Sequence, residues 1–266
     1  TWLQMKRDGY EADKNDIVVS FKGIDMNLTA NWDGTVDSYQ WSDDGSKVYF
    51  IAAIDGTKQL FEVNFPGMTR IAINVQQITK GNFDVNGIVG FSGSKVIVTR
   101  GDMNHAAEIY SYDLKKKDWK QISNINTEDY KSLALSKTER RYVTTTDGKK
   151  MLVWVILPPN FDASKKYPTL LYCQGGPQSA LTQSYSFRWN FQLMAANGYI
   201  VVAPNRRGMP GHGVEWNEQI SGDWGGQVMQ DYLSAIDDVA KEKYVDKDRL
   251  GCVGASYGGY SAFYLA

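Results

Sequence analysis

The sequence predicts two domains of different class: an antiparallel β domain over residues 1–138, followed by an α/β domain over residues 139–266. Two observations lead to this division. The first part alternates short β-rich runs with clusters of turn residues, whereas the second alternates apolar runs with patterns of helical period. The length of 266 residues also fits two domains of ordinary size.

The first part contains runs of β-branched and aromatic residues bounded by Asp, Gly and Ser. We expect strands at residues 37–42, 47–53, 59–64, 85–91, 95–99 and 108–112. The motif Gly45-Ser46-Lys47-Val48 recurs as Gly93-Ser94-Lys95-Val96, at an offset of 48 residues. Four short strands in about 40–50 residues is the period of one β-propeller blade. The sequence therefore predicts the C-terminal blades of a partial β-propeller, too few to close a ring. An antiparallel sandwich is the alternative.

The second part opens with a predicted hairpin, in which residues 141–146 and 151–157 flank the turn Asp147-Gly148. Further strands are expected at 169–173, 199–203 and 250–253, and helices at 187–197 and 228–243. In the first of these helices, Trp189, Leu193 and Ala196 share one side. Apolar strands without polar alternation, separated by helices, indicate a parallel sheet that is covered on both faces.

Charge and cysteine content exclude several classes of function. The chain has 29 Lys and Arg against 30 Asp and Glu, so it carries no excess charge that would attract nucleic acid. The longest apolar run, residues 151–157, is far shorter than the ~20 residues of a membrane-spanning helix. Cys173 and Cys252 lie in apolar runs and suggest small core side chains rather than a disulfide framework or a metal site. We expect no metal, no cofactor, and no nucleic-acid or membrane partner.

Residues 254–259, Gly-Ala-Ser-Tyr-Gly-Gly, fit the pattern Gly-x-Ser-x-Gly. The pattern alone is common, but here a predicted strand enters it and an apolar segment suited to a helix leaves it. Gly254 and Gly258 lack the Cβ atoms that would collide where strand and helix cross. The context predicts the nucleophile elbow of an α/β-hydrolase, with Ser256 as nucleophile and the Tyr257 N–H as an oxyanion donor. The alternative is a glycine-rich turn with an idle serine.

A second glycine-rich segment, Gln174-Gly175-Gly176-Pro177, directly follows the strand expected at 169–173. Hydrolases of this class supply their second oxyanion donor from a loop in such a position. Glycine lets the backbone N–H come close to a substrate. We therefore expect Gly175 to contribute the second donor, although a plain turn would have the same composition.

Four stretches resemble the prolyl oligopeptidase family of serine peptidases, in the branch that contains acylaminoacyl peptidases and bacterial dipeptidyl peptidases. They are residues 157–161 with 166–168, residues 174–177, residues 205–208 with 222–226 and Asp231, and residues 248–260. Upstream, Trp41-Ser42-Asp43-Asp44-Gly45 matches the blade pattern of that family's propeller. Within the branch, the sequence is most similar to dipeptidyl-peptidase-V-like enzymes of Bacteroidetes.

The resemblance implies a serine exopeptidase that cleaves short peptides, of the dipeptidyl peptidase or acylaminoacyl peptidase type, through an acyl-enzyme on Ser256. It implies an oxyanion hole formed by Tyr257 and the loop at Gly175. Gln174 replaces a His or Tyr of many relatives, so its amide either donates to the oxyanion or braces the loop. We expect Arg207 and Asp223 to brace a neighbouring loop as an ion pair.

Two other functions stay open: a carboxylesterase, which needs the elbow but no propeller, and a non-catalytic propeller–hydrolase interaction protein. The expected partners are short peptide substrates, and a homodimer is a further option. The location stays open between the bacterial periplasm and cytoplasm, with the periplasm favoured.

The catalytic base is the missing part of this prediction. The two histidines, His105 and His212, both precede Ser256, whereas α/β-hydrolases follow the order Ser, then Asp or Glu, then His. We expect His105 in a blade turn and His212 in a glycine-rich loop. The sequence ends ten residues after Ser256. We therefore expect an internal piece of a longer protein, in which the hydrolase domain is truncated after the elbow. The triad Asp and His would then lie outside this sequence, and the piece by itself would be inactive.

Overall fold

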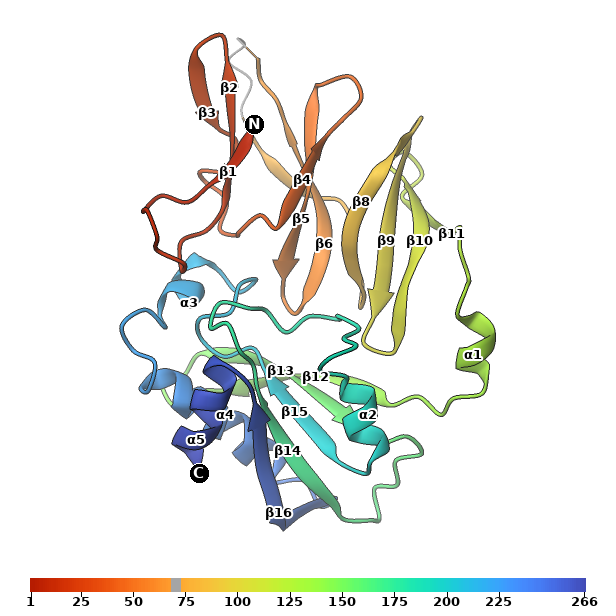
Figure 1. Cartoon of the computed structure of the whole chain (residues 1–266), viewed down its shortest axis with the longest axis vertical. Helices are drawn as coiled ribbons and strands as arrows, with labels where there is room; N and C mark the ends of the chain where they lie inside the picture. The colour runs from red at the N-terminus through yellow and green to blue at the C-terminus, as the bar shows by residue number, and fades with distance from the viewer. Residues whose placement is uncertain (68–72) are drawn as a thin grey trace. The chain divides into compact units, whose positions relative to one another are not determined.

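The computed structural model describes residues 1–67 and 73–266 and divides into two compact units (Figure 1). The first unit contains residues 1–128 with two short later segments, 182–184 and 210–214, and the second contains residues 129–181, 185–209 and 215–266. The division after Glu128 precedes the boundary predicted after residue 138. Strand β12 (Lys137–Thr144) also starts before that boundary, and it pairs along its whole length with a strand of the second unit.

The first unit consists of antiparallel sheets whose strands follow one another in chain order. A three-stranded sheet contains β1 (Trp2–Gln4), β2 (Asp16–Phe21) and β3 (Ile24–Asn27). A four-stranded sheet contains β4 (Ser38–Trp41), β5 (Lys47–Ile54), β6 (Thr57–Asn64) and β7 (Val75–Gln77). A second four-stranded sheet contains β8 (Asp84–Ser92), β9 (Lys95–Asp102), β10 (His105–Asp113) and β11 (Asp118–Gln121).

The 48-residue sequence repeat corresponds to a structural repeat. Lys47 begins the second strand of one four-stranded sheet, and Lys95 begins the second strand of the other. Gly45 and Gly93 both adopt positive φ, 67° and 60°, in the turns that precede these strands. Equivalent turn residues therefore produce equivalent hairpins in both sheets, as the repeated motif predicts.

Strand β5 is buried on both faces, which explains its unbroken apolar sequence. Val48, Phe50 and Ala52 pack in one apolar cluster with β2 and β6, whereas Tyr49 and Ile51 pack in another cluster with β8 and β9. Because side chains alternate along a strand, one strand serves two cores. This is why the run lacks the polar alternation of a strand with one face in water.

Asp84, at the start of β8, is a fully buried carboxylate that attaches residues 182–184 to the first unit. It accepts hydrogen bonds from the Lys58 N–H (2.8 Å), the Gln183 N–H (3.1 Å) and the Thr182 hydroxyl (2.5 Å). Burial raises the pKa of Asp84 to about 6, although these hydrogen bonds act in the opposite direction. The segment is thus held by a group whose charge changes in mildly acidic solution.

This carboxylate predicts a pH dependence of stability. Because its pKa rises from 3.8 in the unfolded chain to about 6 in the folded one, the folded state binds more protons between these values. Stability should therefore fall as the pH rises through that window, by up to about 3 kcal/mol. Asp84→Asn keeps an acceptor oxygen and should remove the effect. Urea unfolding of both proteins across the window measures it, and parallel profiles would contradict the prediction.

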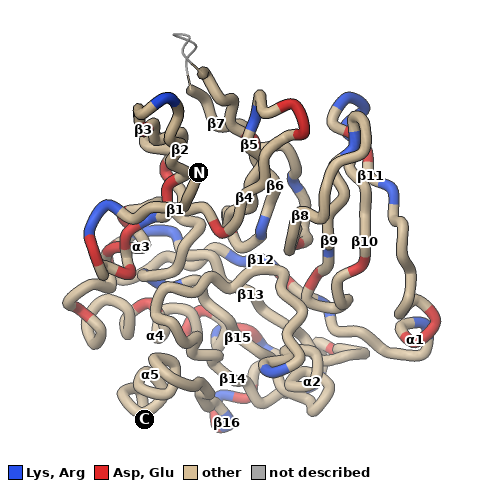
Figure 2. Tube along the Cα trace, turned by 45° about the horizontal axis from the view of Figure 1, so that its top comes forward, with Lys and Arg blue, Asp and Glu red and all other residues tan. Residues whose placement is uncertain are grey.

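The second unit contains one five-stranded sheet with the order β12-β13-β15-β14-β16. Its other strands are β13 (Lys150–Leu157), β14 (Tyr167–Cys173), β15 (Ile200–Pro204) and β16 (Val245–Gly254). β12 and β13 form the predicted antiparallel hairpin, and β13 is also antiparallel to β15. The other three strands are parallel to one another, as predicted, and β14 lies between β15 and β16. β14 and β15 contain no charged residue, as buried central strands require (Figure 2).

Helices cover both faces of this sheet, as predicted. Met229, Tyr232 and Ile236 of α4 (Gln227–Val239) pack in one core with alternate residues of β13 and β15. On the opposite face, Phe191 of α2 (Phe191–Ala196) contacts the Tyr172 ring, with centroids 4.8 Å apart. Leu193 is exposed, so the apolar side predicted for α2 was wrong: the helix starts only after the Asn190 cap, and its buried residues are Phe191 and Ala195.

The remaining helices are α1 (Thr127–Lys131), α3 (Val214–Glu218) and α5 (Tyr257–Leu265). Among the residues that the structure describes, no helix has the length and apolar character needed to cross a membrane.

Candidate active site

Two glycine-rich loops of the second unit leave the sheet side by side. β14 and β16 are parallel neighbours, and Cys173 at the end of one is paired with Gly254 at the end of the other. The residues that follow, Gln174-Gly175 and Ala255-Ser256, therefore start from the same carboxyl edge of the sheet. In open α/β sheets, this edge is where ligands bind.

Ser256 lies on a tight turn between β16 and α5, as the sequence predicts. Its φ of 57° and ψ of −128° are rarely adopted by a residue with a side chain, and this indicates a backbone held by its surroundings. A Cβ on Gly254 would lie 2.5 Å from the Cys173 carbonyl oxygen, and one on Gly258 would overlap the same atom. Glycine at both positions thus allows β16 and α5 to pass β14 at backbone contact.

The segments of both predicted oxyanion donors lie next to Ser256. Tyr257 is the first residue of α5, and the first amides of a helix have no acceptor within it. A Cβ on Gly175 would lie 2.9 Å from the Ala255 carbonyl oxygen and 3.5 Å from the Ser256 Cβ. The Gly175 backbone therefore contacts the elbow directly, and only glycine fits there. The two loops form one small site around the serine.

Gln174 is engaged inside its own loop. Its side-chain Nε2 donates a hydrogen bond to the Ser179 hydroxyl at 3.0 Å. Its backbone carbonyl accepts a bond from the Arg206 guanidinium at 3.1 Å. Of the two roles considered for the Gln174 amide, these contacts favour bracing of the loop.

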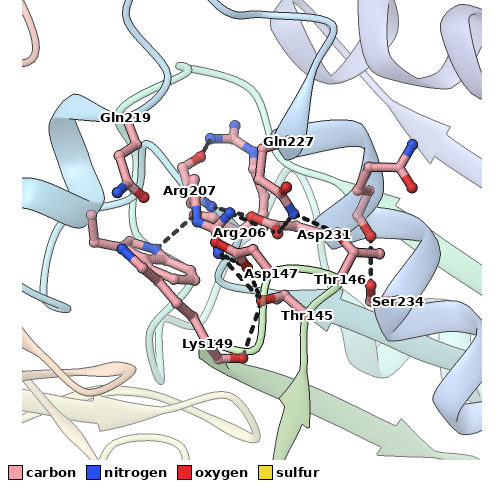
Figure 3. Close-up of polar contacts among 12 residues, drawn as sticks. Thr145, Thr146, Asp147, Lys149, Arg206, Arg207, Gln219, Gln227, Asp231 and Ser234 are labelled. Carbon is pink, nitrogen blue, oxygen red and sulfur yellow. Dashed lines mark hydrogen bonds and ion pairs between the residues drawn. The ribbon is translucent and has the colours of Figure 1, made fainter.

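Arg207 has acidic partners other than the predicted one. Its Nη2 lies 2.7 Å from the Asp147 carboxylate, and its backbone N–H donates to the Asp231 carboxylate at 3.0 Å (Figure 3). Asp223 instead accepts a hydrogen bond from the backbone N–H of Gln227, at the start of α4. The predicted pair of Arg207 with Asp223 is thus corrected: the sheet brings the β12–β13 turn and α4, not the residue-223 loop, to the guanidinium.

The two carboxylates beside Arg207, those of Asp147 and Asp231, have pKa values shifted in opposite directions. Burial alone would raise the pKa of Asp147, but the Thr145 hydroxyl and the Arg207 guanidinium lower it to about 2. Asp231 is fully buried, and burial raises its pKa despite the bonds from Arg207 and Gln227. The Arg207 guanidinium therefore lies beside two different carboxylates. Asp147 has a low pKa, whereas the pKa of Asp231 is already raised and would rise further without Arg207.

Both histidines lie in the first unit, whereas Ser256 lies in the second. His105 begins β10, and its Nδ1 lies 2.9 Å from the Asp102 carboxylate across the β9–β10 turn. The sequence predicts His105 in a blade turn; it lies directly after that turn, as the first residue of the strand. His212 belongs to the glycine-rich segment 210–214. Within residues 1–67 and 73–266, no group of three or more His, Cys, Asp or Glu side chains is placed to hold a metal ion.

The sequence reasoning assigned no role to Arg206, whose side chain is fully buried behind the loop at residues 174–177. A signal in the sequence is that an arginine stands two residues after Pro204, where the apolar run of β15 ends. A charged residue at the carboxyl end of a central strand is a candidate site residue for that reason.

Comparisons with known proteins agree with the family that the sequence resembles. The chain matches the family model of the prolyl oligopeptidase family over residues 185–266 and that of the dipeptidyl peptidase IV N-terminal region over residues 10–152. It is 44% identical to dipeptidyl-peptidase 5 of Porphyromonas gingivalis and 45% identical to that of Porphyromonas endodontalis. Both matches cover all of this chain and 38% of the relative. The chain thus spans about two-fifths of the length of these relatives.

Solved structures show the same fold. Acylaminoacyl peptidase of Pyrococcus horikoshii superimposes with a TM-score of 0.82 at 23% identity, over 96% of this chain and 39% of the other. Dipeptidyl peptidase 4 of Porphyromonas gingivalis gives a TM-score of 0.72 at 19% identity, over 99% of this chain and 38% of the other. From its β-rich first part to the serine elbow, the chain belongs to the prolyl oligopeptidase family.

Proposed function

We propose that the protein containing this chain is a serine exopeptidase that releases short units from peptides, of the dipeptidyl peptidase or acylaminoacyl peptidase type. The observation that carries the proposal is the position of Ser256: a strained turn between strand β16 and helix α5, with the Gly175 backbone against it. The names of the relatives, dipeptidyl-peptidase 5, support the same class of reaction.

In this proposal, the Ser256 Oγ attacks the carbonyl carbon of the scissile peptide bond and forms an acyl-enzyme, while the amine leaves with a proton. The backbone N–H groups of Tyr257 and Gly175 donate hydrogen bonds to the carbonyl oxygen as it gains negative charge. A general base takes the serine proton. The order of catalytic residues in α/β-hydrolases places that base after the nucleophile, so we assign it to neither His105 nor His212.

We further propose that the four-stranded sheets of the first unit are blades of a β-propeller. Two consecutive meanders with equivalent turns, 48 residues apart in sequence, support this proposal. A propeller that limits access to a hydrolase favours short peptides over proteins. This is the feature that separates a peptidase from a carboxylesterase with the same elbow.

A fluorophosphonate probe tests the nucleophile. The protein containing this chain should be labelled, and its Ser256→Ala variant should not. Labelling that persists in the variant would remove Ser256 from the mechanism. Dipeptidyl amides, N-acetylaminoacyl amides and short-chain esters then identify the substrate class. We expect hydrolysis of one or both amides, and turnover of the esters alone would favour a carboxylesterase.

A further inference from the structure

Arg206 is a buried cation whose role in the fold is not obvious. Its side chain has no exposed surface, and within the described part of the chain it forms no ion pair with a carboxylate. Burial of a guanidinium away from water is unfavourable unless hydrogen bonds replace its hydration. An apolar residue would fill this position at lower cost, so the contacts of the guanidinium indicate what it does.

Those contacts are with neutral oxygens, and two of them belong to the loop beside Ser256. Nη2 donates to the Gln174 carbonyl at 3.1 Å, and Nη1 donates to the Pro177 carbonyl at 2.9 Å. The guanidinium thus holds both ends of the segment that contains Gly175. Its planar group presents several donors in fixed directions, which suits it to fix the path of a backbone.

The same guanidinium is held from its other side by the body of the second unit. Nη1 also donates to the Arg207 carbonyl at 2.7 Å, and Nε donates to the Tyr232 hydroxyl of α4 at 3.0 Å. Tyr232 is itself fully buried. The loop is therefore attached through Arg206 to a strand end and a core helix rather than to mobile surface groups.

Arg206 also contacts the side chain of Tyr257, whose backbone N–H is the other proposed oxyanion donor. Its guanidinium carbon lies 4.8 Å from the ring centroid of Tyr257, whose hydroxyl donates to the Trp224 carbonyl at 2.8 Å. Burial raises the pKa of Tyr257 to about 12, so the ring stays neutral and the contact is of the cation–π kind. One buried cation thus touches the segments of both donors.

We propose that Arg206 is a positioning residue that fixes the Gln174–Pro177 loop and Tyr257 so that both oxyanion donors are in place before substrate binds. The inference rests on the proposed function. A preorganised oxyanion site stabilises charge that develops only in the transition state. Loss of Arg206 should therefore lower kcat more than it raises KM.

The test compares Arg206→Met with the unsubstituted protein that contains this chain, using the peptide substrate found for it. Met replaces the side chain by an unbranched apolar one. We expect kcat to fall by about 10- to 100-fold, below the loss for removal of a direct oxyanion donor, with KM changed less than about threefold. A peptide boronate, which forms a tetrahedral adduct on serine, should bind more weakly by a similar factor, whereas a product dipeptide should bind unchanged.

Arg141→Met is the matched control. Arg141 is an arginine of the same unit that bonds Glu242 and Tyr244 at 2.7 Å each. The Arg141→Met substitution should lower the melting temperature and leave kcat unchanged. Arg206→Lys, which can reach fewer acceptors, should restore part of the lost rate. If Arg206→Met does not fold, Tyr232→Phe is the second variant: it removes the acceptor of Nε and the long bond, 3.5 Å, that the same hydroxyl donates to the Gln174 carbonyl. It should lower kcat by a few-fold.

An unchanged kcat in Arg206→Met, or equal weakening of the boronate and the product, would overturn the positioning role. A fluorophosphonate assay separates this failure from that of the proposed function. An unsubstituted protein that is not labelled at Ser256 overturns both, whereas equal labelling rates with and without Arg206 overturn only the positioning role.

Discussion

Replacing Gly258 by alanine should destabilise the second unit by about 3 kcal/mol and abolish turnover. The added Cβ would overlap the Cys173 carbonyl oxygen, an atom of the central strand β14. That oxygen cannot move away without disturbing the pairing of Cys173 with Gly254. Relief therefore has to come from a shift of α5 and Ser256. Urea unfolding, together with the rate of fluorophosphonate labelling, measures both effects.

Gly259→Ala is the control one position further along the same helix. A Cβ there would lie 3.7 Å from its nearest neighbour, the Gly254 carbonyl oxygen, which is an ordinary contact distance. Alanine also favours a helix over glycine by about 0.5–1 kcal/mol. This variant should be as stable as the unsubstituted protein or slightly more so, and it should keep its labelling rate. An equal loss in both variants would show that close approach to β14 is not the cause.

Arg207→Met should cost about 3–5 kcal/mol, because it removes one partner of a buried charge cluster. Met retains an apolar contact with Trp216, over whose ring the guanidinium carbon lies at 4.8 Å. It leaves the fully buried Asp231 carboxylate without its cation. We expect stability and kcat to fall together, without a change in preference between substrates with free and acetylated N-termini. A changed preference at an unaltered melting temperature would place Arg207 in the specificity site instead.

The pH dependence of this loss identifies the carboxylate responsible. Burial already raises the pKa of Asp231, and removal of Arg207 should raise it further. A raised carboxyl pKa in the folded state makes stability fall as the pH rises. The variant should therefore lose less stability in acid than at neutral pH. Asp223→Asn, which removes an exposed charge at the start of α4, should change stability by less than about 1 kcal/mol at either pH.

The sequence by itself determined the features that depend on residues close together in the chain. Asp147-Gly148 between two runs rich in β-branched and aromatic residues predicts the β12–β13 hairpin, because a tight turn needs only local chemistry. The pattern around Ser256 predicts the elbow, since strand, turn and helix follow one another within a dozen residues. The recurrence of Gly45-Ser46-Lys47-Val48 likewise predicts equivalent hairpins in two sheets. Each of these signals is complete within one segment.

Only the tertiary structure decided which distant groups meet. Asp147 precedes Arg207 by 60 residues and Asp231 follows it by 24, so no local period relates them. The carbonyls of Gln174 and Pro177 that surround Arg206 carry no side-chain signal at all. Likewise, nothing in the run 182–184 indicates that it bonds Asp84, about a hundred residues earlier in the chain. Their contacts depend on strand order and on where each loop leaves its sheet. A buried charge then binds whatever acceptors the packing brings near, because leaving it without partners would cost more than any local preference.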